Sequence, residues 1–180
     1  MAPLILAMSE QRDFISKVCI TGQHRDMLDN VMEFFSLKAD YDLNVMQPRQ
    51  TLFEVSNRIL NKLETVLNME NPDLVIVQGD TTTAFIGSLA AFYMKIKVAH
   101  VEAGLRSHDK WSPFPEEVNR KLISAIADFH FSPTLAAADQ LRSEKVMGDI
   151  HVTGNTVIDA LLLGVEQVNK NNSLANQFNF

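Results

Sequence analysis

The residues from Val75 to Arg106 constrain the fold of this chain more than any other stretch. Leu74–Val77 is a continuous apolar run rich in β-branched residues, which is typical of a strand buried on both faces. The pattern predicts a helix over residues 81–94 and a second short strand at Val98–Val101. A strand–helix–strand unit of this length is the right-handed crossover that joins two parallel strands. We therefore predict a parallel sheet at the centre of the molecule.

An acidic residue follows each of these two strands. Gln78, Gly79 and Asp80 come after the first strand, and Glu102 comes directly after the second. In an open parallel sheet, ligands bind outside the carboxyl ends of the strands, so Asp80 and Glu102 are candidates for chemistry. Each also has a structural explanation. Asp80 is a good N-cap for the helix that follows, and Glu102 can form an ion pair with Arg106.

Two further acidic residues lie at the start of a later predicted helix. Pro115 stands at its favoured first position, and Glu116 and Glu117 occupy the first turn. Acids in a first turn interact favourably with the helix dipole by about 0.3–1 kcal/mol, which alone explains their presence. The residue pattern thus indicates an α/β domain with an acidic crevice, and it leaves both structural and catalytic roles open.

The rest of the chain alternates short strands with helices and contains no internal repeat. This alternation is typical of an α/β fold with a largely parallel sheet. We expect residues 1–168 to form one domain and the asparagine-rich residues 169–180 to form a loosely ordered polar tail. The other predicted strands are Lys17–Thr21, Asp40–Val45, Phe129–Phe131 and Ile150–Thr153, and the other predicted helices are a short one over Leu4–Met8, then His24–Phe35, Gln50–Leu67, Thr134–Arg142 and Asn155–Val168.

Charge and cysteine content narrow the possible partners. The net charge is −6 at pH 7, and no basic run is interleaved with aromatic residues, which argues against nucleic acid. The apolar opening Met1–Met8 is too short to span a bilayer, so no membrane partner is expected. Cys19 is the only cysteine, and its apolar neighbours predict a buried, inert thiol. Without a disulfide framework or metal-ligand spacing, we expect a cytoplasmic protein with no metal and no cofactor.

Six stretches of the sequence occur in the order found in one enzyme family. HVEAGLR (100–106) and TGNTVIDAL (153–161) are specific, and the similarity that the six stretches mark extends from Met1 to about Val168. On these stretches the chain resembles the non-hydrolysing UDP-N-acetylglucosamine 2-epimerases, which are relatives of the GT-B glycosyltransferases. The matching stretches are Gly22–Arg25, Met46–Gln47, Gln78–Thr83, His100–Arg106, Pro115–Arg120 and Val152–Asp159.

The resemblance implies two Rossmann-like, doubly wound domains with the sugar nucleotide in the cleft between them. It implies that UDP-N-acetylglucosamine is inverted at C2 to UDP-N-acetylmannosamine, by elimination of UDP and its re-addition. Inversion needs proton donors and acceptors on both faces of the sugar, hence more than one carboxylate. The catalytic acids of the family fall on Asp80, Glu102 and Glu116.

The resemblance also implies a second site and a partner subunit. Bacterial members bind a second UDP-N-acetylglucosamine as an activator, and those contacts would fall on Gln23, His24 and Arg49, with Glu116 shared. Asp26 stands where the family usually has Glu or Gln, so the side chain at this position is shorter than the family's. The complete protein is expected to be a homodimer.

The chain departs from the family pattern at both ends. The family has a first strand and a loop with a diphosphate-binding arginine before the part that matches here, and a second domain with a catalytic histidine after it. We therefore read the chain as the N-terminal half of the fold without its first strand, and expect it to be inactive alone. The alternatives are a non-catalytic remnant or the sugar-nucleotide-binding half of a GT-B glycosyltransferase, and the acid triplet disfavours the latter.

The departure at the amino end has a consequence for the sheet. In the doubly wound order the first strand lies between the second and the fourth. Here its neighbours would be Lys17–Thr21 and Leu74–Gln78, which are both apolar enough to be buried. Without the first strand they would face a slot with unpaired edges, so we expect that they either close up and pair directly or that something else fills the slot.

Overall fold

Strands and helices alternate in the computed structural model, which describes residues 1–22 and 25–170. The elements in chain order are α1 (Ala2–Ser9), β1 (Cys19–Ile20), α2 (Arg25–Phe34), β2 (Tyr41–Asp42), α3 (Leu52–Glu70), β3 (Leu74–Gln78), α4 (Thr82–Tyr93), β4 (Lys97–Val101), α5 (Glu116–Ile126), β5 (Phe129–Ser132), α6 (Leu135–Ser143), β6 (Asp149–Val152) and α7 (Thr156–Lys170).

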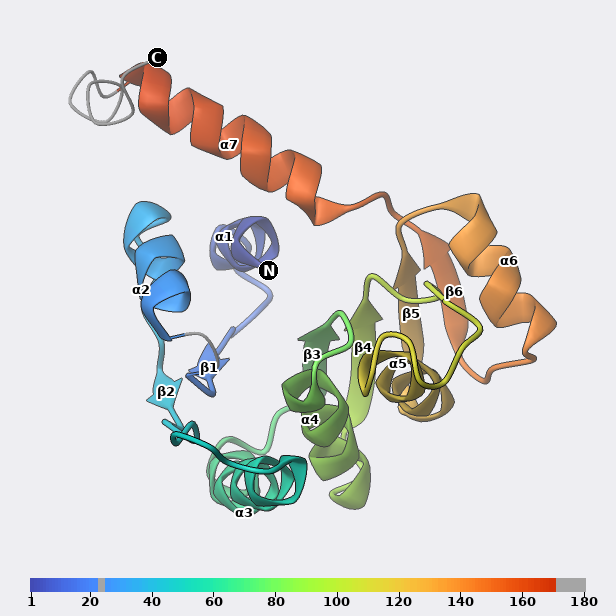
Figure 1. The fold of residues 1–180 in the computed structure, drawn as a ribbon. Helices are drawn as coiled ribbons and strands as arrows, with labels where there is room; N and C mark the ends of the chain where they lie inside the picture. Colours follow the sequence, from blue (N-terminus) through green and yellow to red (C-terminus); the bar gives the residue numbers. More distant parts are fainter. Residues whose placement is uncertain (23–24, 171–180) are drawn as a thin grey trace.

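The strands form two separate parallel sheets, which Figure 1 shows apart from one another. One sheet contains β1 and β2, and the other has the order β3-β4-β5-β6. This arrangement confirms the predicted α/β class with parallel strands. Among the described residues β1 and β3 do not pair, so each keeps one edge without a strand partner. Of the two expected arrangements, direct pairing is therefore the wrong one.

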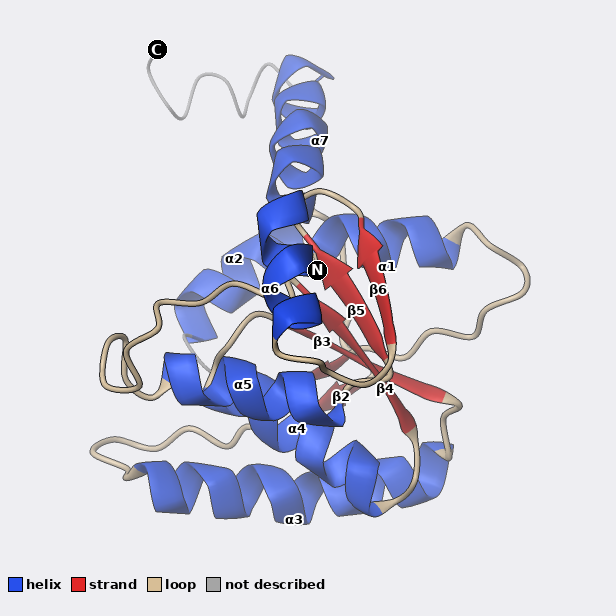
Figure 2. Cartoon of the chain, turned by 90° about the vertical axis from the view of Figure 1, so that its right-hand side faces the viewer, coloured by secondary structure: helices blue, strands red, loops and turns tan. Residues whose placement is uncertain are grey.

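Helices cover the four-stranded sheet and hold the two sheets together. Helices α4 and α5 pack on β3 and β4, α3 lies against α4, and α6 packs on β5 and β6. Figure 2 shows α4, α5 and α6 gathered on one side of these strands, as right-handed crossovers between sequential neighbours require. After β6, helix α7 runs back to α1, and a Cβ at Gly164 would lie 3.6 Å from the Phe34 ring of α2.

The apolar core lies on both sides of α4. One cluster of buried residues joins α4 to the strands and to α5, and the other joins α4 to α3 and the segment after β2. Ala84 and Ala91 belong to the first cluster and Ile86 to the second, because they lie on different faces of the same helix. Helix α4 thus packs against both clusters and positions β3 and β4.

Strand β3 is less buried than its apolar sequence predicts. The side chain of Leu74 is 37% exposed, whereas Val77 is 9% exposed and belongs to the core. The expectation that this strand is buried on both faces is therefore wrong. The physical reason is its position at an edge of the four-stranded sheet, where only β4 pairs with it.

Cys19 is exposed, which contradicts the predicted burial of its thiol. It lies in β1, whose second edge has no strand partner among the described residues. Neighbouring atoms remove enough water to raise the pKa of the thiol to about 11, and the Asp42 carboxylate adds to the effect. The raised pKa keeps the thiol protonated near neutral pH, although the residue is exposed.

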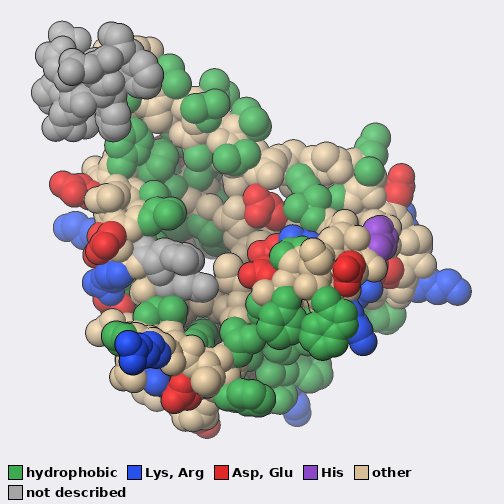
Figure 3. Space-filling model, in the orientation of Figure 1, with side chains coloured by type: hydrophobic (Ala, Val, Ile, Leu, Met, Phe, Trp, Pro, Cys, Tyr) green, Lys and Arg blue, Asp and Glu red, His purple; other side chains and the backbone are tan. Residues whose placement is uncertain are grey.

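Helix α7 presents an apolar face to solvent. Hydrophobic side chains along this helix are visible in Figure 3, and five of them are at least half exposed. The helix extends to Lys170, two residues beyond the predicted domain boundary, and residues 171–180 of the predicted tail lie outside the described part. The exposed apolar residues are Val157, Ile158, Leu161, Leu162 and Val165. None of the described helices combines the length and apolar character needed to cross a membrane.

Candidate active site

The two strand-end acids lie on neighbouring turns. Strands β3 and β4 pair in register, with Gln78 opposite Val101, so both strands end at the same level. The Gly79 amide donates to the Val101 carbonyl at 3.0 Å. A Cβ built at Gly79 would lie 3.5 Å from Glu102 Oε2, so the Glu102 carboxylate lies above this glycine. Because Asp80 follows Gly79 directly, the structure brings these two candidates together.

Asp80 is not the N-cap of α4, contrary to the structural explanation considered above. Thr81 is the N-cap, and its hydroxyl accepts a hydrogen bond from the Ala84 amide at 3.2 Å. Asp80 lies one residue too early to reach these amides. Its carboxylate instead accepts from Arg120, with Oδ2 at 2.6 Å from Nη2 and 2.9 Å from Nε. The acid is therefore held by a cation from α5.

Glu102 is likewise not paired with Arg106. The Arg106 side chain is 1% exposed and donates to Glu144 at 2.8 Å and to the Ser124 hydroxyl at 2.9 Å. The backbone of Glu102 has a φ of 66°, in the left-handed region that costs a non-glycine residue roughly 1–2 kcal/mol. Such strain is concentrated at functional sites. Glu102 thus has an unfavourable backbone conformation and no role in the predicted ion pair.

The adjacent acids Glu116 and Glu117 have different environments. Glu117 is fully buried and accepts from the Ser107 amide at 2.9 Å, the His108 amide at 3.2 Å and Arg120 at 3.2 Å. Burial disfavours the charged carboxylate, but these hydrogen bonds outweigh it and lower the pKa of Glu117. Glu117 therefore fastens the loop before α5 to the helix, which is a structural role.

Glu116 lies on the face of α5 that meets the Asp80 turn. It precedes Asn119 by three residues and Arg120 by four, and residues with these spacings share one helix face. Asn119 donates to the Asp80 carbonyl at 2.8 Å, and Arg120 binds the Asp80 carboxylate. Glu116 is partly exposed, so it is available to a ligand at this edge of the sheet. Acidic side chains gather near the centre of the face seen in Figure 3.

The predicted activator contacts are only partly described. Gln23 and His24 lie outside the described residues. Thr21, just before them, has its hydroxyl 3.2 Å from that of Thr83, so the end of β1 lies beside the start of α4. Arg49 is exposed in the segment between β2 and α3, with a φ of 58°.

The residue pattern alone missed two side chains of this edge, His100 and Arg120. His100 Nε2 lies 2.8 Å from the Gly79 carbonyl oxygen, and Arg120 binds Asp80. Both stand in stretches that carry the family resemblance, and this was the one available signal. The described residues contain no group of three or more side chains suited to hold a metal ion.

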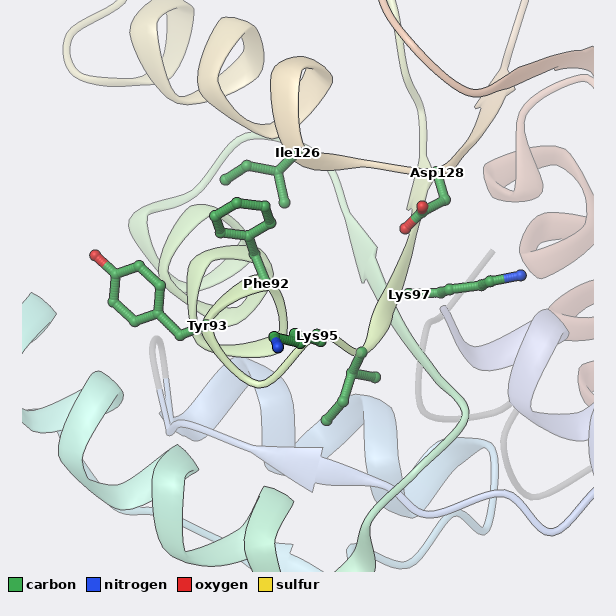
Figure 4. Close-up of a pocket in the computed structure, with 7 residues that line it drawn as sticks. Phe92, Tyr93, Lys95, Lys97, Ile126 and Asp128 are labelled. Carbon is green, nitrogen blue, oxygen red and sulfur yellow. The ribbon is translucent and has the colours of Figure 1, made fainter.

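The depression shown in Figure 4 lies at the amino ends of the strands, opposite to the end that carries the acids. It has a volume of about 590 Å³ and is lined by the end of α4, the start of β4 and the end of α5, with Phe92, Lys97 and Ile126 among its residues. Lys97 begins β4, whereas Glu102 follows its last residue. This depression is therefore at the amino ends of the strands and separate from the acids.

Buried His100 predicts a pH dependence of stability. Burial lowers the pKa of His100 to about 4, from about 6.5 in an unfolded chain. Because the unfolded state binds the proton first, the contribution is complete above pH 6.5 and is lost as pH falls toward 4. We expect the free energy of unfolding to decrease by about 3 kcal/mol over this window. Burial lowers the pKa of His130 as well, so it contributes with the same sign.

Denaturant unfolding at a series of pH values measures this dependence. His100→Gln should reduce the slope between pH 6.5 and 4, because glutamine does not titrate and only the contribution of His130 remains. Equal slopes in the unsubstituted chain and in this variant would show that His100 is not the group responsible.

Comparison with known proteins identifies the family. The sequence profile described as UDP-N-acetylglucosamine 2-epimerase matches residues 6–179. The UDP-N-acetylglucosamine 2-epimerase of Neisseria meningitidis is 52% identical over 169 residues, which are 93% of this chain and 45% of that protein. The Bacillus subtilis enzyme of the same name is 54% identical over 162 residues, 89% of this chain and 43% of that protein.

Solved structures agree with the sequence comparison. The UDP-GlcNAc 2-epimerase of N. meningitidis bound to UDP-GlcNAc superposes with a TM-score of 0.92 at 50% identity, over 98% of this chain and 48% of that one. The enzyme of Methanocaldococcus jannaschii in complex with UDP-GlcNAc and UDP gives 0.90 at 38% identity, over 99% and 49%. The chain thus spans about half the length of the relatives it matches. It belongs to the UDP-N-acetylglucosamine 2-epimerase family.

Proposed function

We propose that this chain provides the acid-bearing half of an enzyme that interconverts UDP-N-acetylglucosamine and UDP-N-acetylmannosamine. The observation that carries the proposal is the grouping of Asp80, Glu102 and Glu116 at one edge of the sheet. The structural roles that the sequence allowed for two of these acids are absent from the structure. Asp80 does not cap α4, and Glu102 does not pair with Arg106. The relatives whose structures contain UDP-GlcNAc support the choice of substrate.

The chemistry explains why several carboxylates are needed. A base removes the weakly acidic proton at C2 while the C1–O bond breaks and UDP departs, which leaves a glycal. A proton is then delivered to C2 from the opposite face, and UDP adds back at C1. Positive charge develops on the ring as the C1–O bond breaks, so nearby carboxylates also stabilise the transition state.

Each acid is suited to a different part of this task. Asp80 stays beside the Arg120 guanidinium, which holds its carboxylate in place at the carboxyl end of β3. Glu102 follows the last residue of β4 and Glu116 is the first residue of α5, so the acids come from two different elements. Inversion at C2 requires proton transfer on both faces of the ring, and groups that approach from different elements meet this requirement.

The complete protein is proposed to act as a cytoplasmic homodimer in the biosynthesis of cell-envelope polysaccharide. The activator contacts at Gln23, His24, Arg49 and Glu116 belong to the same proposal. Support for these contacts comes from the family resemblance.

Proton exchange at C2 tests the proposed function. The test uses a chimera in which residues 1–168 replace the matching part of the N. meningitidis enzyme. We expect it to incorporate deuterium at C2 of UDP-N-acetylglucosamine in deuterated water, followed by NMR. The 180-residue chain alone should not exceed a control without protein, because an open edge neither excludes water nor strengthens the electrostatic interactions.

The experiment on the chimera and the experiment on the isolated chain test different parts of the proposal. An inactive but folded chimera, beside an active N. meningitidis enzyme, would refute the function. Exchange by the chain alone would refute the need for the rest of the enzyme.

A further inference from the structure

We infer that His100 is a positioning residue that holds the Asp80 turn against the Glu102 turn. The inference rests on the proposed function and concerns a residue whose ring is buried and therefore closed to a substrate. His100 precedes Glu102 by two residues on β4. Its ring reaches across to the turn after β3 and binds the carbonyl of Gly79, the residue before Asp80. One side chain therefore spans the two acid-bearing turns.

The contact lies beside two residues with left-handed backbone conformation. Gly79 has a φ of 72° and Glu102 a φ of 66°, so both strands end in left-handed residues. The Glu102 carboxylate lies over Gly79, and Asn119 fixes the Asp80 carbonyl from α5. The His100 hydrogen bond thus connects a side chain of β4 to the backbone of this turn. Its loss would leave the turn held by α5 and by the Gly79 amide.

The environment of His100 selects a single form of the ring. The carbonyl oxygen of Gly79 only accepts, so Nε2 must carry the hydrogen and donate. The ring is 1% exposed, and burial lowers its pKa to about 4. Among the described residues Nδ1 has no hydrogen-bond partner, which favours its unprotonated form. His100 is therefore a permanent neutral donor at working pH and not an acid–base catalyst.

His130 provides a matched control inside the same sheet. It is the Cα partner of His100 on β5, is fully buried, and its Nε2 lies 2.9 Å from the Met147 carbonyl oxygen. That carbonyl belongs to the segment between α6 and β6, away from the acids. The two histidines share burial and bond type, and only His100 binds an acid-bearing turn.

The kinetic test uses His100→Leu, His100→Gln and His130→Leu in the chimera. We expect His100→Leu to lower kcat by roughly 100-fold, the effect of a displacement of about 1 Å in a catalytic group, with KM changed less than threefold. His100→Gln should recover most of kcat, because its amide nitrogen can donate from the position of Nε2. His130→Leu should lose comparable thermal stability and keep kcat within threefold.

Each alternative result overturns the inference. Unchanged kcat in His100→Leu would remove the positioning role, and a His100→Gln variant as slow as His100→Leu would mean that the ring itself acts. Nitrogen-15 NMR of the histidines in the unsubstituted chain gives a readout independent of activity. We expect the Nε2–H tautomer for His100, and the Nδ1–H tautomer would overturn the inference even if the leucine variant fails to fold. An inactive unsubstituted chimera would instead refute the proposed function.

Discussion

Asp80→Asn, Glu102→Gln and Glu116→Gln are each expected to lower turnover of the chimera by roughly 10²–10⁴-fold, the usual contribution of a positioned acid or base. The amide keeps the size of each side chain and removes its ability to take or deliver a proton. Deuterium exchange at C2 measures proton transfer at this carbon, and formation of UDP-N-acetylmannosamine measures the complete reaction. A residue whose variant loses less than tenfold has only a structural role.

These variants need controls for loss of stability, because an acid can also contribute to folding. Asp80→Asn also weakens the ion pair with Arg120, so its thermal unfolding must be compared with that of the unsubstituted chimera. Asp139→Asn is the matched surface control, since Asp139 lies on α6 and pairs only with exposed Arg142 among the described ion pairs. It should keep full turnover. A comparable loss in Asp139→Asn would assign the effect to folding and not to catalysis.

The 180-residue chain alone is expected to have low stability and to associate as its concentration rises. Strands β1 and β3 each keep an edge without a strand partner in the described structure. Unsatisfied buried N–H and C=O groups cost about 1–3 kcal/mol each, and a few of them equal the total stability of a domain, about 5–15 kcal/mol. Free strand edges also pair with other chains. Denaturant unfolding and light scattering over a range of concentrations measure both effects.

Cys19→Lys tests whether association uses the β1 edge. Cys19 is exposed on this strand, and a lysine on an edge strand opposes pairing with another chain. The variant should associate less, whereas Cys19→Ser should behave like the unsubstituted chain and excludes disulfide cross-linking. A monomer at every concentration, with a sharp transition and ordinary stability, would contradict the prediction.

Local patterns in the sequence were sufficient for the central unit of the fold. The apolar run of β3, the helix α4 and the short strand β4 were all predicted, because strand and helix periodicities depend on neighbouring residues. The placement of Asp80 and Glu102 at one edge followed from the rule that parallel strands joined by a helix end on the same side. The class of the fold and the edge that carries the acids were thus determined before any tertiary contact was known.

The partners of the side chains required the packed structure. Asp80 binds Arg120, which lies 40 residues away, and Arg106 binds Glu144, which lies 38 away. Glu116 and Glu117 look equivalent in sequence, but the docking of α5 buries only Glu117. These outcomes depend on how α5 and α6 pack against the sheet, and long-range packing leaves no periodic signal in the chain. For the same reason the exposure of Cys19 followed from the unpaired edge of β1, which its apolar neighbours in the sequence do not reveal.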